Sequence, residues 1–316
     1  MRSAGPSVGT VHVIGNVQLD VVAGPVLALP RPGGDDIVDS IAVRPAGAAG
    51  NVSLALAALG VRHRLFGVLG DDQAGRWVAD ELRRCGLAED LVIAPGQETG
   101  ISIALEAPAR ERAFLTAHGV LQGYGEQDVP DEALAADTVV LTGYFSLPGL
   151  RGAGTRRLLE RAQAGGATTV FDTGWDPEDW RGDAVEEILS MLALVDVFLP
   201  NEPEAVALTG TTDVDEALAL LREHCPGWVV LKRGADGVVA AGPDGERLNI
   251  PAPPVVALDT TGAGDSLAAG MLAELSAGRG MAQALLMGVR VASTVVGRPS
   301  RDRYPSRAEL LDPVRA

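Results

Sequence analysis

The sequence contains very little lysine, few aromatic residues and only two cysteines. Of its 26 basic residues only Lys232 is a lysine, and 42 acidic residues give a net charge of −16. Because nucleic acids and anionic membranes recruit basic surfaces, this balance argues against both as partners. Cys85 and Cys225 form no CxxC pair, so we expect no structural zinc site. Two unpaired thiols are typical of a reducing cytoplasm.

Long hydrophobic runs are also absent. No apolar run approaches the roughly 18 residues that a membrane-spanning helix needs. The first residues, MRSAGPSVGTVHVIG, lack the apolar core of a secretion signal. We therefore expect a cytoplasmic protein without a membrane partner.

Several widespread catalytic motifs are missing as well. The P-loop pattern GxxxxGK[ST] cannot occur, because the one lysine follows Leu231. The dinucleotide pattern GxGxxG fails after Gly262-Ala263-Gly264, where Leu267 takes the third glycine position. HExxH and GxSxG do not occur, and the four histidines show no ligand spacing. These absences exclude P-loop NTPases, common dehydrogenases, zincins and α/β-hydrolases as first expectations.

Apolar runs typical of strands alternate with helical patterns from residue 138 onward. Strands are expected at 138–142, 168–171, 194–199 and 228–231, and helices at about 150–164, 183–192, 213–224 and 280–296. Such alternation predicts an α/β fold whose mostly parallel sheet is covered on both faces. Ligands then bind at the carboxyl ends of the strands.

The sequence pattern of the first third of the chain is different. A strand is expected over 11–17, with Asp20 following it. Between about 91 and 120, three β-like pieces at 91–93, 101–106 and 112–117 are joined by short turns at hairpin spacing. Together with 36–44, we expect these pieces to form a small antiparallel layer inserted into the main fold.

The stretch from Asp259 to Asp265, DTTGAGD, opens into an alanine- and leucine-rich helix. Its glycines permit tight turns, and the first amides of the helix lie at the positive end of its dipole, so the loop is suited to bind an anion. A carboxylate beside an anion suggests that Asp265 takes a proton from a nucleophile that attacks phosphate. A simple glycine turn with Asp265 as a helix cap explains the same residues.

The chain resembles carbohydrate kinases of the ribokinase family, also called the PfkB family. The likeness spans about residues 10 to 300, with two family signatures in order and four supporting motifs. The signatures are AGAAGNVS (46–53, followed by Gly60 and Gly70) and DTTGAGDSLAAGML (259–272); the supporting motifs are Asp20, GVLGDDQAG (67–75), Asn201-x-x-Glu204 and Lys232-x-Gly234-x-x-Gly237. The resemblance implies a ribokinase-like three-layer α/β/α fold, in one kinase domain over 1–316, with lid strands inserted at about 36–45 and 91–120.

The resemblance also implies roles at the acceptor side of a site. Asp265 would be the general base, and the backbone amides of Gly262, Ala263 and Gly264 would form the anion hole. The sugar hydroxyls would be held by Asp20, Gly47 and Asn51, and Arg112 of the lid is a further substrate-binding candidate. Taken alone, Asp20 is more simply a strand-end turn residue and Asn51 a helix N-cap.

On the nucleotide side, the resemblance places Asn201 and Glu204 near Mg²⁺, with Glu204 acting through water. The same two residues form a capping-box pattern, and both interpretations can hold together. The remaining implied nucleotide contacts are Lys232, Gly234, Gly237 and Thr260. For Lys232 and its neighbours the alternative is a hairpin turn with a solvated charge pair. The segment 288–296 would line the adenine pocket.

Asp259 and the carbonyl of Thr261 resemble a K⁺ site of the family, with later ligands near Gly297. The sequence departs from the family where Asp172-Thr173-Gly174-Trp175-Asp176 replaces an Asp-x-Asn type of sequence. The residues on that side of the phosphates are therefore left open.

The implied activity is transfer of the γ-phosphoryl group of ATP, with Mg²⁺, to a hydroxyl of a small sugar such as fructose or ribose. A homodimer joined through the lid is expected. Two other kinds of function remain open: a nucleoside or phosphosugar kinase, and a catalytically silent sugar- or nucleotide-binding protein on the same fold. The sequence does not name the sugar, because side chains of the lid set that choice.

Overall fold

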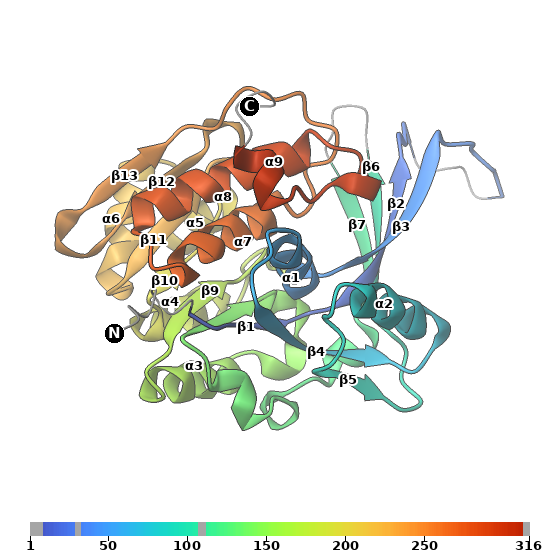
Figure 1. Ribbon diagram of the computed structural model, residues 1–316, viewed down its shortest axis with the longest axis horizontal. Coiled ribbons are helices and arrows are strands. Elements are labelled where there is room, and N and C mark those ends of the chain that lie inside the picture. Colours follow the sequence, from blue (N-terminus) through green and yellow to red (C-terminus); the bar gives the residue numbers. More distant parts are fainter. Residues whose placement is uncertain (1–8, 29–32, 107–111, 312–316) are drawn as a thin grey trace, which may run out of the picture.

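A nine-stranded sheet forms the centre of the molecule (Figure 1). The computed structural model describes residues 9–28, 33–106 and 112–311. The sheet order is β13-β12-β11-β10-β9-β8-β1-β4-β5, and the seven strands from β11 to β5 in that order are parallel. The strands are β1 (Val11–Gly15), β4 (His63–Gly70), β5 (Leu91–Ala94), β8 (Thr138–Thr142), β9 (Thr168–Asp172), β10 (Val197–Phe198), β11 (Trp228–Lys232), β12 (Val238–Ala241) and β13 (Arg247–Ile250).

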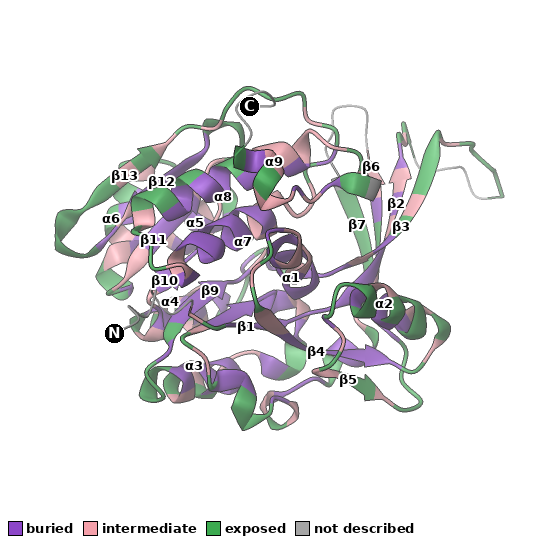
Figure 2. Cartoon of the chain, in the orientation of Figure 1, coloured by how far each residue is buried: buried purple, intermediate pink, exposed green. Residues whose placement is uncertain are grey.

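Helices cover both faces of this sheet. Because successive strand residues point to opposite faces, Val13 packs in the core shared with one group of helices and Ile14 in the core shared with the other. The first group is α1 (Ala48–Ala58), α2 (Gln73–Arg84), α7 (Ala263–Ser276) and α8 (Met281–Val296); the second is α3 (Ala153–Ala164), α4 (Ala184–Met191), α5 (Glu202–Thr209) and α6 (Val214–His224). Figure 2 shows the buried strands between these layers. The predicted three-layer α/β/α fold is confirmed.

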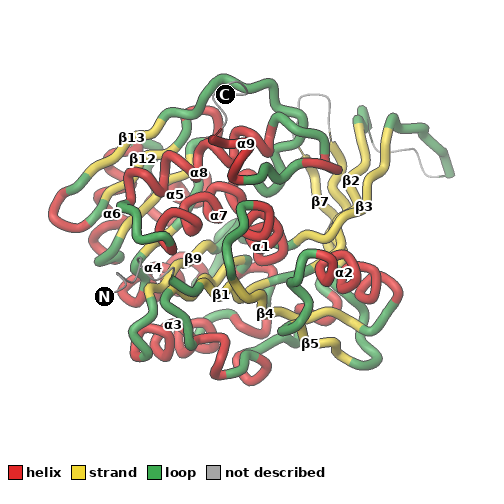
Figure 3. Tube along the Cα trace, in the orientation of Figure 1, coloured by secondary structure: helices red, strands yellow, loops and turns green. Residues whose placement is uncertain are grey.

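A second, four-stranded sheet stands at one edge of the molecule (Figure 3). Its order is β3-β2-β6-β7, and it contacts α1 and α2. The β2–β3 and β6–β7 pairs are antiparallel, whereas β2 and β6 are parallel. Its members are β2 (Gln18–Gly24), β3 (Ser40–Ala46), β6 (Ile101–Glu106) and β7 (Arg112–Ala117).

The small sheet differs from the expected antiparallel layer in its parallel β2–β6 pair and in two of its strands. The piece at 91–93 was expected in it, but it belongs to β5 and pairs in parallel with β4 of the large sheet. The reason is that α2 serves as the crossover between β4 and β5, which makes these strands parallel neighbours. The strand expected over 11–17 ends at Gly15, and a separate strand, β2, then enters the small sheet.

β1 lies at the switch point of the large sheet. From β1 the sheet grows through β4 and β5 on one side and through β8 to β13 on the other. Parallel α/β sheets bind ligands at the carboxyl ends of the strands that flank such a point. The part of the chain that the structure describes contains no helix whose length and apolar character would let it span a bilayer.

Candidate active site

The start of α1 is held against the carboxyl end of β1. Gly47 is the N-cap of α1 and has a φ of 87°. A Cβ atom there would lie 2.3 Å from the carbonyl oxygen of Asn16, so the position requires glycine. The amide of Ala48 donates to Oδ1 of Asn16 over 3.0 Å. Asn51 is therefore inside the first turn of α1, and its interpretation as an N-cap is wrong.

Asp265 lies in the first turn of α7 and faces Asn51. Gly262 is the N-cap of α7 with a φ of 73°, and no side chain caps the helix. The interpretation of Asp265 as a cap is therefore wrong. Nδ2 of Asn51 donates to Oδ2 of Asp265 over 2.8 Å. The structure thus brings together two residues that the sequence separates by 214 positions.

The carboxyl group of Asp265 has a raised pKa and is therefore a weaker acid than an exposed aspartic acid. Burial raises its pKa to about 7, and the nearby Asp172 adds to the effect, while the hydrogen bond from Asn51 opposes it. A carboxyl group with a pKa near neutrality exchanges protons readily at physiological pH. Asp265 is therefore chemically suited to accept a proton from a hydroxyl group.

The glycine turn before α7 offers amides of two kinds. The amide of Ala263 donates to the carbonyl of Thr260 over 3.2 Å. Within the described part of the chain, the amides of Gly262 and Gly264 have no acceptor. These two amides lie at the positive end of the helix dipole and are available to an anion.

Lys232 lies beside this turn and is not solvated. Its Nζ is 2.6 Å from Oδ2 of Asp172, and its side chain is 12% exposed. A Cβ atom on Gly264 would lie 3.3 Å from Nζ, which places the ammonium group against the glycine turn. Burial alone would lower the pKa of Lys232, but Asp172 and Glu204 raise it, so the side chain stays charged. The solvated-pair interpretation is wrong for Lys232.

The rest of the β11–β12 connection behaves as a surface turn. Arg233 pairs with Glu202 and Asp236, and Gly234 is exposed. Gly237 has a φ of 87°, and a Cβ atom there would lie 2.1 Å from the carbonyl oxygen of Ile250. The close approach at Gly237 and the φ of 53° at Gly234 explain both glycines by backbone geometry.

Asp172 is a site residue that the sequence did not assign. It ends β9, beside the ends of β8 and β10, and its carboxylate holds Lys232. The segment 172–176, which departs from the pattern of the family that the sequence resembles, contained the signal for this residue. An acidic residue at the carboxyl end of a parallel strand lies at the edge of the sheet where ligands bind.

Asn201 and Glu204 form the expected capping box at the start of α5. Oδ1 of Asn201 accepts from the Glu204 amide, and Oε2 of Glu204 accepts from the Asn201 amide, each over 2.9 Å. Nδ2 of Asn201 also donates to Oε1 of Glu204 over 2.7 Å. Glu204 is buried, and burial raises its pKa to about 7. Each carboxylate oxygen accepts one hydrogen bond and keeps a second lone pair that can face a metal ion or a water bound to one.

Asp20 lies in the middle of β2, so its interpretation as a strand-end turn residue is wrong. Its Oδ1 accepts from Nε2 of Gln18 over 3.0 Å, and Gln18 is linked in turn to Asn16. Burial raises the pKa of Asp20. The chain of hydrogen bonds connects Asp20 with the residue that holds the start of α1.

One face of the small sheet carries a polar row. Arg44, Asp20, Ser102 and Thr116 are successive register partners across β3, β2, β6 and β7. The hydroxyl groups of Ser102 and Thr116 are 2.9 Å apart. The side chain of Arg112 lies outside what the structure describes.

The expected cation ligands Asp259 and Thr261 contact arginines. Nη1 of Arg44 is 2.6 Å from Oδ2 of Asp259. Nη2 of Arg303 donates to the carbonyl of Thr261. Neither arginine was identified from the sequence. Thr260, between the two ligands, is exposed.

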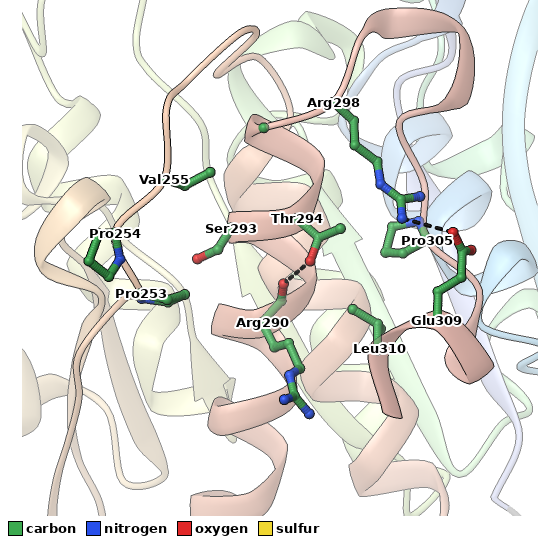
Figure 4. Close-up of a pocket in the computed structure, with 11 residues that line it drawn as sticks. Pro253, Pro254, Val255, Arg290, Ser293, Thr294, Arg298, Pro305, Glu309 and Leu310 are labelled. Atoms are coloured by element: carbon green, nitrogen blue, oxygen red, sulfur yellow. Dashed lines mark hydrogen bonds and ion pairs between the residues drawn. The ribbon is translucent and has the colours of Figure 1, made fainter. Parts of the chain in front are cut away.

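A cavity of about 500 Å³ lies between the segment 253–255 and α8 (Figure 4). Val255 on one side faces Ser293 and Thr294 on the other. Gly297 allows this approach, because a Cβ atom there would lie 2.8 Å from Cγ2 of Val255. The volume is within the range of small-molecule sites.

Several known proteins are similar in sequence to most of this chain. The pattern of the family described as pfkB family carbohydrate kinase matches residues 10–306. An uncharacterized sugar kinase, YegV, from Escherichia coli is 29% identical over 96% of this chain and 93% of its own length. A cytidine kinase from Thermococcus kodakarensis is 30% identical over 80% of this chain and 87% of its own.

Solved structures share the fold. A ribokinase from Thermotoga maritima superposes with a TM-score of 0.81 at 22% identity, covering 96% of this chain and 98% of its own. A putative ribokinase II from E. coli, in complex with ATP and Mg²⁺, superposes with a TM-score of 0.80 at 20% identity, covering 95% of this chain and 97% of its own.

Proposed function

Since this chain belongs to the pfkB family of carbohydrate kinases, and is therefore a phosphotransferase that acts on an alcohol group, we propose that it transfers the γ-phosphoryl group of ATP to a hydroxyl of a small sugar. The observation that carries the proposal is the position of Asp265. It faces Asn51 over 2.8 Å, beside the glycine turn at the start of α7. A base next to a phosphate-binding turn is the arrangement that phosphoryl transfer to a hydroxyl requires.

In the proposed reaction, a carboxylate oxygen of Asp265 takes the proton of the sugar hydroxyl as the hydroxyl oxygen attacks the γ-phosphorus. The bond from the γ-phosphorus to the oxygen that bridges the β- and γ-phosphates breaks as the new bond forms, and ADP leaves. The amides of Gly262 and Gly264 then stabilise the charge of the transferring group. Ala263 joins them when its amide releases the carbonyl of Thr260. Lys232, held by Asp172, supplies positive charge next to the same turn.

ATP is proposed to bind across the carboxyl ends of β9 to β11, with its base in the cavity between 253–255 and α8. Thr260, Gly234 and Gly237 border the nucleotide in this arrangement. Glu204, oriented by Asn201, would hold a Mg²⁺ ion through water, and the ion would supply positive charge that neutralises the phosphates. Burial raises the pKa of Glu204, and a cation bound nearby would lower that pKa and favour the ionised carboxylate.

The acceptor is proposed to lie between the main fold and the polar row of the small sheet. Asp20 and Asn51 accept and donate hydrogen bonds to its hydroxyls, Gly47 allows its close approach to the backbone, and Arg112 is a further proposed substrate contact. The whole chain, 1–316, then acts as one kinase domain, with the small sheet as a lid that keeps water from the phosphoryl group.

A nucleoside kinase is the second candidate. It is favoured by the likeness to a cytidine kinase, which is 30% identical over 80% of this chain. A nucleoside offers the same ribose hydroxyls to Asp20 and Asn51, but it also needs room under the small sheet for its base.

The opposite face of the small sheet supports a homodimer. Val43, Val21, Ile103 and Leu115 form an apolar row across its four strands, and Ile41 adds to it. Ile41 and Leu115 are 65% and 61% exposed. Exposed apolar patches of this kind mark protein interfaces, and a second copy offers the same row by twofold symmetry. A cytoplasmic location is inferred from the two free cysteines.

The deciding experiment is a coupled ADP-release screen with Mg²⁺ and ATP. The acceptors are fructose, ribose, 2-keto-3-deoxygluconate, cytidine, adenosine, inosine and fructose phosphates. Release with one sugar, abolished in Asp265→Asn, supports the proposal, whereas release only with a nucleoside selects the second candidate. Absence of ADP release with every acceptor supports a silent binding protein instead.

A further inference from the structure

Two buried arginines occupy the place where the resemblance suggested a K⁺ ion. Arg44 comes from β3 of the small sheet, and Arg303 follows the end of α8. They are 8% and 4% exposed, respectively. Arg44 bridges Asp259 and Asp20, with Nη1 at 2.6 Å from the first and Nη2 at 3.9 Å from the second. Nη1 of Arg303 is 3.7 Å from Oδ2 of Asp259.

The oxygens expected to bind the ion are engaged with these guanidinium groups or with backbone amides. Oδ2 of Asp259 accepts from Arg44 and Ser300, and its Oδ1 accepts from the Thr261 amide. The carbonyl of Val296, next to Gly297, accepts from the amides of Leu258 and Asp259 over 2.7 and 3.2 Å. An ion placed among these oxygens would lie close to two buried positive charges that repel it. The residues present do not fit K⁺.

We infer that this protein works without a monovalent cation, because Arg44 and Arg303 provide the positive charge that organises the anion-binding turn. The inference rests on the proposed function for its kinetic consequence. Both arginines are positioning residues in this account. They act on the backbone that leads into Gly262 and do not touch the reacting atoms.

The geometry of the peptide group explains how Arg303 acts. In a trans peptide the carbonyl and the following amide point in opposite directions. When Arg303 holds the carbonyl of Thr261, the amide of Gly262 is turned to the other side of the chain. Gly262 is the N-cap of α7, so its orientation sets that of the turn offered to phosphate. The charge on Asp259 compensates the buried guanidinium groups.

The same C-terminal segment reaches the general base. The hydroxyl of Tyr304 donates to Oδ1 of Asn51 over 3.2 Å, and Asn51 donates to Asp265. The guanidinium group of Arg303 lies 5.4 Å from the centre of the Tyr304 ring. Arg303 therefore holds the anion-binding turn, and Tyr304 holds the Asn51–Asp265 pair. Loss of Arg303 is expected to affect turnover more than substrate affinity.

The first test compares K⁺, Na⁺ and tetramethylammonium chlorides at equal ionic strength. For the wild-type protein we expect kcat to vary by less than about twofold, the scale of non-specific screening. The melting temperature of the ligand-free protein should be the same in the three salts. A stimulation of kcat by K⁺ of more than about tenfold, or a rise in melting temperature specific to K⁺, overturns the inference.

The second test uses Arg303→Met, which keeps the apolar stem but removes the charge. We expect kcat to fall about tenfold or more, less than the loss of an anion-hole donor itself, with a smaller change in KM for ATP. Arg303→Lys should recover part of kcat, and added guanidinium ion should partly rescue Arg303→Met. Unchanged kcat in Arg303→Met overturns the positioning role.

One control variant and two alternative readouts keep these outcomes separable. Arg157→Met removes a half-exposed arginine of α3 that pairs with Glu126, away from the site, and should leave kcat unchanged. If Arg303→Met does not fold, the salt comparison on the wild-type protein still tests whether a monovalent cation is needed. The kinetics of Arg303→Lys then test the positioning role of Arg303. If no acceptor yields ADP, the proposed function fails, while the melting comparison decides the cation question by itself.

Discussion

The carboxyl group of Asp265 makes the stability of this protein depend on pH in a direction that can be worked out. Its pKa is raised from 3.8 to about 7, first by burial and then by Asp172. Since the folded protein holds this proton more tightly than the unfolded chain, the stabilisation is full below about pH 4. It is lost as the pH rises through about 7. At about pH 8 the ionised group destabilises the fold.

Asp265→Asn removes this titration while keeping the shape of the side chain. The full difference between 3.8 and about 7 corresponds to roughly 4 kcal/mol. Partial exposure of Asp265 screens the charge, so we expect about 1–3 kcal/mol. The amide oxygen of asparagine can still accept from Nδ2 of Asn51. The variant should therefore be more stable than the wild type at about pH 8, and the difference should vanish toward about pH 4.

Urea unfolding of both proteins across this pH range measures the difference directly. Asp80→Asn, at an exposed carboxylate on α2, is the matched control and should change the unfolding free energy by less than about 0.5 kcal/mol at every pH. Turnover of Asp265→Asn should fall by about 10²- to 10⁴-fold, as expected for a lost general base. A variant that is less stable than the wild type at about pH 8, or a difference that does not depend on pH, refutes the reasoning.

Three further predictions concern the backbone, the buried ion pair and the dimer. Gly47→Ala places a Cβ atom 2.3 Å from the carbonyl oxygen of Asn16 at a φ of 87°, and should destabilise the fold by about 2–4 kcal/mol in urea unfolding; a cost below about 1 kcal/mol contradicts the geometry. Lys232→Met leaves Asp172 buried without its partner and should cost about 3–5 kcal/mol and raise KM for ATP, whereas unaltered KM argues against a nucleotide contact. Ile41→Asp, at an exposed position, should convert dimer to monomer in light scattering with little loss of unfolding free energy; a wild-type monomer contradicts the proposed interface.

Local patterns in the sequence predicted most elements of the large sheet and its helices. The helix expected over 213–224 begins at Val214 and ends at His224, and that expected over 280–296 begins at Met281. Asn201 and Glu204 make the capping box that their spacing indicated. These features depend on residues a few positions apart, so hydrophobic periodicity and capping preferences are sufficient to predict them.

Strand partners were harder to predict. The piece at 91–93 has the composition of a hairpin strand, but its partner is decided by the crossover helix α2. Asp20 follows an apolar run that reads as one strand, while the chain in fact leaves the large sheet after Gly15 and enters the small one. Periodicity identifies a strand, but it does not say to which sheet the strand belongs.

The sequence by itself determined the α/β class, the likeness to the family and the residues of the glycine turn, because each of these is written in short, contiguous patterns. Only the tertiary structure decided what those residues face. Arg44 and Asp259 are 215 positions apart, and Lys232 and Asp172 are 60 apart. No local rule links such pairs, since their meeting follows from the order of the strands. It is this packing that puts arginines where K⁺ was expected and places Asp172 against Lys232.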